Sequence, residues 1–234
     1  MKTIYSTLVL YGCLFVTGET VQAHALWIET HSTGTPGKPH EVRIYYGEPA
    51  ESVRERVSDW WSDVGAFTLF LYGPEGRAQV LPVTAGDDHY AALSIPDREG
   101  TYVLCIAQPV SETFDRHKYQ FNSLVPVQIG HPQGKLHSLS DAFWVVARST
   151  GRAISGTPVQ VTVQLDGKPV EKLEIKVFSP NGWSKTFVTD TAGSVTFVPD
   201  RPGHYLVEAI HRADVTGDTF DHLHRIATSS LTVE

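Results

Sequence analysis

Cysteine and charged residues are scarce in this sequence. Two cysteines occur in 234 residues, and one of them, Cys13, lies in a segment that we expect to be removed. The expected mature chain therefore has no structural disulfide and no zinc site built on a CxxC motif. Charged residues make up 19% of the chain, and the formal net charge is -7. This acidic balance argues against nucleic acid as a partner.

The usual signatures of an enzyme are also missing. The sequence contains no Gly-x-Ser-x-Gly nucleophile motif, no glycine-rich phosphate loop and no HExxH zinc helix. Cys105 falls inside an apolar segment, where a thiol is usually an inert part of the core. These absences favour a protein that is not an enzyme.

A long apolar run is present only at the N-terminus. Lys2 precedes an apolar stretch that ends at Val16, and a polar stretch then ends in Val21-Gln22-Ala23. This pattern predicts a secretory signal peptide, residues 1–23, and a periplasmic or secreted protein. A lipid anchor at Cys13 is the alternative, although Tyr11 fits a lipobox poorly. No other run approaches the roughly 20 apolar residues of a membrane span, so we expect none in the mature chain.

The remainder of the chain consists of short segments with the character of β-strands. Residues 41–46 and 159–165 alternate polar and apolar side chains, and Asp166-Gly167 is typical of a hairpin turn. Such segments recur between glycine and proline turns, as in an antiparallel sandwich. Only residues 50–64, which include Trp60 and Trp61, break this pattern. We expect a helical turn or a functional loop there.

A polar stretch rich in turn formers, residues 130–140, divides these segments into two sets. We therefore predict an all-β fold with two immunoglobulin-like β-sandwich domains after the signal peptide. The N-terminal sandwich is expected at 24–129, the linker at 130–140 and the C-terminal sandwich at 141–234.

Cleavage after Ala23 would make His24 the N-terminal residue. Its α-amine and its imidazole Nδ1 could then close one chelate ring on a metal ion. The α-amine has an ordinary pKa of about 7.7–8.0, so a metal can displace its proton near neutral pH. One further imidazole would complete the three-nitrogen set called a histidine brace, which suits Cu(II) or Ni(II).

The second imidazole has several candidates, since the sequence contains 11 histidines. His211 is our first choice because it ends a predicted strand, where loops and termini gather. His89 is the second choice because it lies at a turn beside two aspartates, and His117 is a weaker third. His222-x-His224 would place two imidazoles on one face of an extended segment. Four of the others are expected to be exposed or to have little effect on binding: His31, His40, His131 and His137.

Several stretches of the sequence resemble one known family, catalogued as domain of unknown function 4198. These stretches are His24-Ala-Leu-Trp-Ile-Glu29, Trp60-Trp-Ser-Asp63, Asp166-Gly-Lys-Pro169, Thr189-Asp-Thr-Ala-Gly193 and Pro202-Gly-His-Tyr205. The resemblance covers nearly the whole mature chain, and its start at His24 is the most specific part. It implies an extracytoplasmic metal-binding role associated with nickel and cobalt uptake.

Together these features predict a secreted or periplasmic protein that binds one divalent transition metal ion: nickel, cobalt or copper. The expected ligands are His24 with His211 or His89, at the junction of the domains. The expected partners are the metal ion and a metal-uptake permease or an outer-membrane receptor. One alternative is a copper-dependent oxidative enzyme acting on polysaccharide, for which Trp27, Trp60 and Trp61 could form a platform. The other is a metal-free surface adhesion or scaffold protein.

Overall fold

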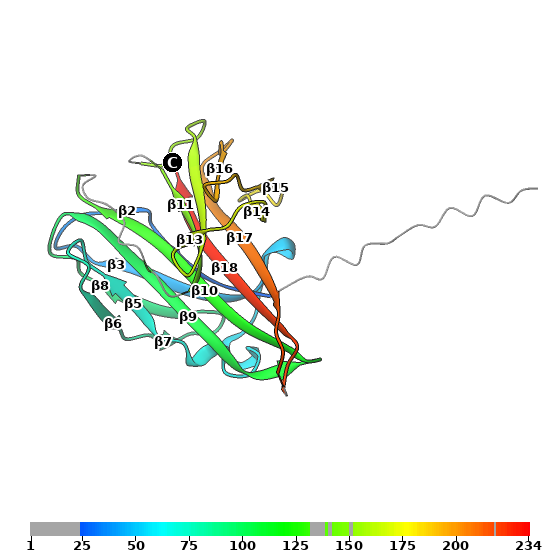
Figure 1. Ribbon diagram of the computed structural model, residues 1–234. Coiled ribbons are helices and arrows are strands. Elements are labelled where there is room, and N and C mark those ends of the chain that lie inside the picture. The colour runs from blue at the N-terminus through cyan, green and yellow to red at the C-terminus, as the bar shows by residue number, and fades with distance from the viewer. Residues whose placement is uncertain (1–23, 132–138, 140–141, 150–151, 218) are drawn as a thin grey trace, which may run out of the picture.

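The computed structural model describes residues 24–131, 139, 142–149, 152–217 and 219–234. The predicted signal peptide, Cys13, His137 and most of the predicted linker lie outside these residues. Within them the chain is built from β-strands and three short 3-10 turns, which confirms the predicted all-β class (Figure 1). None of the helical turns in the described ranges has the length and apolar character that a membrane span requires.

The strands of the described residues form three sheets, and the largest runs through the middle of the molecule (Figure 1). Its order is β15-β14-β17-β18-β10-β9-β5-β6, with β2 paired to β10. The bounds are β2 Thr33–Gly34, β5 Leu69–Tyr72, β6 Ala78–Leu81, β9 Gly100–Phe114, β10 His117–Ile129, β14 Glu174–Phe178, β15 Ser184–Val188, β17 Gly203–Asp214 and β18 His222–Val233.

Two smaller sheets pack against this long sheet. One has the order β1-β3-β8-β7, with β4 paired to β3, and the other has the order β11-β12-β13, with β16 paired to β12. The bounds are β1 Ala25–Thr30, β3 His40–Glu48, β4 Val53–Arg54, β7 Thr84–Ala85, β8 Tyr90–Ser94, β11 Phe143–Arg148, β12 Val159–Leu165, β13 Lys168–Pro169 and β16 Ser194–Phe197. The 3-10 turns are Pro49–Glu51, Val57–Asp59 and Val64–Ala66, in and beside the region predicted to break the strand pattern.

A parallel pairing between β10 and β18 joins the two halves of the chain. Its register runs from His117 opposite His222 to Ser123 opposite Thr228. Strands from residues 24–129 and from residues 141–234 therefore belong to one hydrogen-bonded sheet. The division into two immunoglobulin-like domains with these boundaries stays a prediction.

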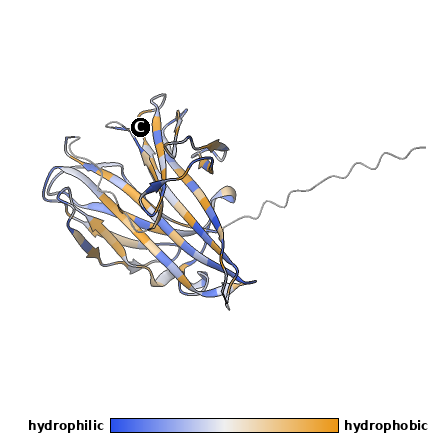
Figure 2. Cartoon of the chain, viewed as in Figure 1, coloured by the Kyte–Doolittle hydropathy of each residue, from blue (hydrophilic) through white to orange (hydrophobic). Residues whose placement is uncertain are grey.

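The long sheet buries apolar side chains on both of its faces. Ile226 packs into the cluster with β1 and β3, whereas the next residue, Ala227, packs into the cluster with β11 and β12. Successive side chains of a strand point to opposite faces, so these two neighbours belong to different cores. Hydrophobic residues are interspersed with hydrophilic ones along the long strands (Figure 2).

Hydroxyl groups of β18 attach β1 to the long sheet. The side chains of Thr228, Ser230 and Thr232 donate to the main-chain carbonyls of Leu26, Ile28 and Thr30, respectively. Ser229 points to the other face, where its hydroxyl accepts from the Ala147 main-chain N–H at 3.1 Å. The run of Ser and Thr near the C-terminus thus fixes β1, and with it the residue that precedes β1, His24.

Two buried residues test predictions made from the sequence. Cys105 is only 4% exposed, and burial raises the pKa of its thiol to about 12, so it is the inert core residue that we expected. The prediction that His40 is exposed is wrong. His40 is buried at the start of β3, where its Nε2 lies 2.8 Å from the hydroxyl of Thr30, and burial lowers its pKa.

Candidate functional site

His24 lies immediately before β1, over the end of β3. Its ring packs on that of Tyr46, with 5.3 Å between the ring centroids. Its Nε2 lies 2.6 Å from Oε1 of Glu55, and the His24 side chain is 45% exposed. The imidazole is therefore held by the protein while part of it remains accessible.

A close approach of the backbone brings Glu55 to His24. After the turn Pro49–Glu51 the chain returns along β3, and the Glu55 main-chain N–H donates to the Tyr46 carbonyl at 2.9 Å. Gly47 permits this return, because a Cβ atom there would lie 2.3 Å from the Val53 carbonyl oxygen. A larger residue at position 47 would push this segment, and the Glu55 carboxylate with it, away from the histidine.

The contact with Glu55 sets the tautomer of His24. An ionised carboxylate only accepts hydrogen bonds, so Nε2 carries the proton and donates it. In the neutral ring this leaves Nδ1 with a free lone pair. A metal-binding histidine typically has this arrangement, with one nitrogen on the metal and the other donating to a carboxylate.

Glu48 interacts electrostatically with His24, and Glu208 interacts with Glu48. Burial raises the pKa of the Glu48 carboxyl, and the nearby His24 acts in the opposite direction. Glu208 on β17 is 5% exposed. Its pKa rises to about 7, because burial outweighs the attraction of Lys176 and because Glu48 adds repulsion. Burial, followed by Glu55, also raises the pKa of Tyr46, so the phenol beneath His24 stays neutral.

A cavity of about 420 Å³ opens beside His24. The strands β17, β18 and β10 supply one wall as two registered rows of side chains. The inner row is apolar and consists of Ile210, Ile226 and Phe121. The outer row is Arg212, His224 and Tyr119. The remaining lining residues come from the neighbouring turns and strand ends: His24, Tyr46, Glu55, Asp59, Trp61 and Phe114.

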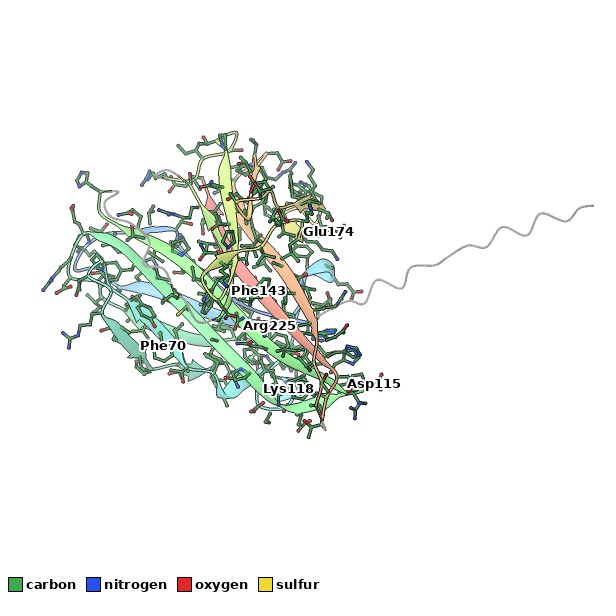
Figure 3. The ribbon with its side chains drawn as sticks, viewed as in Figure 1. Phe70, Asp115, Lys118, Phe143, Glu174 and Arg225 are labelled. Carbon is green, nitrogen blue, oxygen red and sulfur yellow. The ribbon has the colours of Figure 1, made fainter. Side chains whose placement is uncertain are left out.

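Three histidines meet at the outer end of this wall, near the hairpin tip where Figure 3 labels Asp115 and Lys118. The ring centroid of His117 lies 4.7 Å from those of both His222 and His224. Burial, His117, Arg212 and His222 together lower the pKa of His224 to about 4, so its imidazole is neutral at neutral pH. His222 is held by Asp214, whose Oδ1 lies 2.9 Å from Nδ1.

The structure does not bring His211 to His24. His211 lies between two residues of β17 that line the cavity, so its side chain points to the opposite face of the sheet. There its ring packs on Phe143 at 5.6 Å, and its Nδ1 lies 3.5 Å from a guanidinium nitrogen of Arg225. Figure 3 labels Phe143 and Arg225 in this region. Burial and Arg225 lower the pKa of His211.

His89 is likewise separated from His24. Its ring packs on Tyr45 at 5.3 Å, and its Nδ1 lies 2.7 Å from Oδ1 of Asp88. Tyr45 and Tyr46 are neighbours in β3 and point to opposite faces, so His89 and His24 lie on different sides of that sheet. The histidine that shares the cavity with His24 is His224, for which the predicted alternation of His222-x-His224 was the only local signal.

The described side chains contain no preformed metal centre of the usual kind. Among residues 24–131, 139, 142–149, 152–217 and 219–234, no three His, Cys, Asp or Glu side chains are grouped so that they could hold a metal ion. A chelate at His24 would depend instead on the main-chain amine, which becomes available only when His24 is the first residue.

The fold and the position of His24 define an all-β protein with an accessible histidine at the start of its first described strand. The chain belongs to the family described as domain of unknown function (DUF4198), whose model matches residues 21–213. This match confirms the resemblance drawn from the sequence. The comparison with curated proteins finds no match.

Several solved structures match the chain over most of its length, at low identity and low TM-score. A marsupial T cell receptor is 10% identical, with 91% of this chain and 72% of that chain covered and a TM-score of 0.27. A two-domain fibronectin type-III segment of chicken tenascin is 12% identical, with 88% and 97% covered and a TM-score of 0.26. Trypsin-activated alpha-2-macroglobulin from Escherichia coli is 9% identical, with 90% and 16% covered and a TM-score of 0.27.

Proposed function

We propose that the mature chain begins at His24 and binds one divalent transition metal ion, nickel, cobalt or copper, through the α-amine and Nδ1 of that residue. The hydrogen bond from His24 Nε2 to Glu55 carries this proposal, because it leaves Nδ1 as the free nitrogen of the neutral ring. The protein is then a periplasmic or secreted metal-binding protein that accompanies uptake through a permease or an outer-membrane receptor. It is arranged as two immunoglobulin-like sandwiches, 24–129 and 141–234, joined by 130–140.

The third nitrogen in this proposal is the imidazole of His224. It lines the same cavity as His24 and stays neutral at neutral pH, and only a neutral imidazole can bind a metal. His211 and His89, which the sequence favoured, face other sides of their sheets and are replaced in the proposal by His224. A set of three nitrogens suits Cu(II) and Ni(II), with Cu(II) bound more tightly.

Binding is favoured here over oxidation of a polysaccharide. The platform suggested for a polysaccharide used three tryptophans, of which Trp27 and Trp60 are buried in the core. Only Trp61 lines the cavity beside His24. The platform of three tryptophans suggested from the sequence is therefore not formed.

Calorimetry with Ni(II) and Cu(II) tests the proposal on two forms of the protein. One form carries the free α-amine at His24, and in the other form that amine is acetylated. Acetylation should weaken binding by at least 100-fold, because it removes the amine nitrogen as a ligand. His131→Ala serves as a control at an exposed position, and it should leave the affinity unchanged. Equal affinities for the two forms would overturn the proposal.

The choice of the third ligand is tested by three matched variants. His224→Ala should weaken Ni(II) binding, whereas His211→Ala and His89→Ala should not. If His211→Ala or His89→Ala weakens binding and His224→Ala does not, the assignment of His224 is wrong, while the chelate at His24 can still stand.

A further inference from the structure

The cavity beside His24 is lined by a cationic side chain that pairs with no carboxylate of the described residues. Arg212 lines its outer row, and it forms no hydrogen bond or ion pair with any residue that the structure describes. Other arginines are paired: Arg116 with Asp221, and Arg54 with Glu29 at 2.8 Å. Arg212 therefore has an unused capacity to bind an anion.

The carboxylates that line the cavity are engaged elsewhere. Glu55 accepts the hydrogen bond from His24, and Asp59 accepts one from the hydroxyl of Ser58 at 2.9 Å. Neither forms an ion pair with Arg212. The exposed guanidinium of Arg212 is therefore the group in this cavity with which a negative group of a ligand can pair.

The walls next to Arg212 are aromatic. Tyr119 belongs to the same row of side chains, and Trp61 stands edge-on to it, with 5.5 Å between centroids and an interplanar angle of 88°. Phe114 lines the cavity as well and is 67% exposed. Such a large exposed aromatic surface beside a cavity is typical of a place that a ligand covers.

From these contacts we infer that the cavity binds a small organic anion. Its flat apolar body would lie against Trp61, Tyr119 and Phe114, and its carboxylate or a similar planar anionic group would pair with Arg212. The planar guanidinium matches a carboxylate through two parallel hydrogen bonds. The volume of about 420 Å³ lies within the range of roughly 300–1,000 Å³ that is usual for small-molecule sites.

This inference goes beyond metal binding and does not depend on it. The anion is expected to bind the metal-free protein, because no contact in the argument involves a metal. Binding of the anion is therefore measured in the presence of EDTA, on both the form with the free α-amine and the acetylated form. The acetylated form should lose affinity in the separate metal titration and retain its affinity for the anion, so that the two proposals can fail separately.

Three probes with the same ring system and different charges test the inference by calorimetry and NMR titration. They are 2-naphthoate, 2-naphthylmethanol and 2-naphthylmethylamine. The naphthoate should bind at least tenfold more tightly than the neutral alcohol and the cationic amine. Equal affinities for the three, or tightest binding of the amine, would overturn the inference.

Variants test whether Arg212 causes the preference for naphthoate over the neutral and cationic probes. Arg212→Gln should reduce naphthoate affinity about tenfold, to that of the alcohol, while alcohol binding remains and reports an intact cavity. Arg225→Gln is the matched control: this arginine lies on the neighbouring strand and contacts His211 on the opposite face, so the affinities should not change. Trp61→Ala should weaken all three probes. Unchanged naphthoate affinity in Arg212→Gln would overturn the inference.

Discussion

His24 and Glu55 form a hydrogen bond of 2.6 Å between Nε2 and Oε1, across 31 positions of the sequence. This contact selects the nitrogen that remains free in the neutral ring, and it orients the ring over Tyr46. The same Glu55 side chain lines the cavity that contains Arg212 and His224. One carboxylate therefore links the proposed metal chelate to the proposed anion site.

Removing this carboxylate should weaken the metal site without removing its ligands. Glu55→Ala should reduce Ni(II) affinity about 10- to 100-fold, as is usual when a partner behind a metal-binding histidine is lost. Glu55→Gln should lose less, because its amide oxygen can still accept from Nε2. The measurement is calorimetry at pH 7.5 on the form that begins at His24. Glu41→Ala removes an exposed carboxylate from β3 and is the control; equal losses in the two alanine variants would contradict the role given to Glu55.

The hydrogen bonds from the side-chain hydroxyls of β18 to the main-chain carbonyls of β1 should contribute to the stability of the protein. Thr228 is fully buried, and its hydroxyl donates to the Leu26 carbonyl at 2.7 Å. Thr228→Val keeps the shape but leaves that carbonyl without its donor, which should lower the free energy of unfolding by about 1–3 kcal/mol. Urea denaturation measures the change. Thr186→Val, at an exposed position of β15, should change stability by less than about 0.5 kcal/mol, and a similarly small effect at Thr228 would contradict the prediction.

Local patterns in the sequence predicted the positions of several strands, but they did not predict which strands pair with one another in a sheet. The alternation in 159–165 and the turn Asp166-Gly167 correspond to β12 and the start of the hairpin to β13. The parallel pairing of β10 with β18 joins residues about a hundred positions apart, and no local period specifies such a partner. Residues 117–129 were not recognised as a strand at all.

The same limit explains which part of the site was missed. His24 stands out from the cleavage pattern, whereas the strand that follows it was not predicted from the sequence. The assignment of His211 depended on which face of β17 points toward His24, and a shift of one residue changes the face. Ile210 and Arg212 line the cavity and His211 does not, so an argument from the end of a strand could not find His224.

The pairing of β10 with β18 predicts how the protein unfolds. One sheet contains strands from both halves of the chain. A defect in the hydrophobic core on either face of that sheet should therefore destabilise the whole protein. Phe197→Ala removes a ring that is 4% exposed in the cluster with β11 and β12, and should cost about 3–5 kcal/mol. Hydrogen exchange should then accelerate by the same factor for amides of β3 as for amides of β12. Faster exchange in β12 alone would indicate two independently unfolding domains.

Glu208 should make stability fall as the pH rises from about 4.5 to 7. Burial raises its pKa from an ordinary 4.5 to about 7 in the folded protein. Below pH 4.5 both the folded and the unfolded chain bind the proton. Between the two values only the folded chain retains it, so unfolding becomes easier as the pH rises, by about 3 kcal/mol in total. Above pH 7 both states are ionised and the contribution is constant.

A glutamine at this position should remove that pH dependence. Glu208→Gln cannot ionise, so the difference in unfolding free energy between this variant and the native chain should shift in favour of the variant from pH 4.5 to pH 8. The pKa values of His40, His204 and His224 are lowered in the folded protein, so these histidines make stability rise with pH, opposite to the effect of Glu208. They do so in both proteins, and the difference between the two unfolding free energies therefore isolates the effect of Glu208. Glu174→Gln, at an exposed position of β14, should show no such trend. Urea denaturation across this range measures it, and parallel curves for Glu208→Gln and the native chain would show that Glu208 is ionised at little cost.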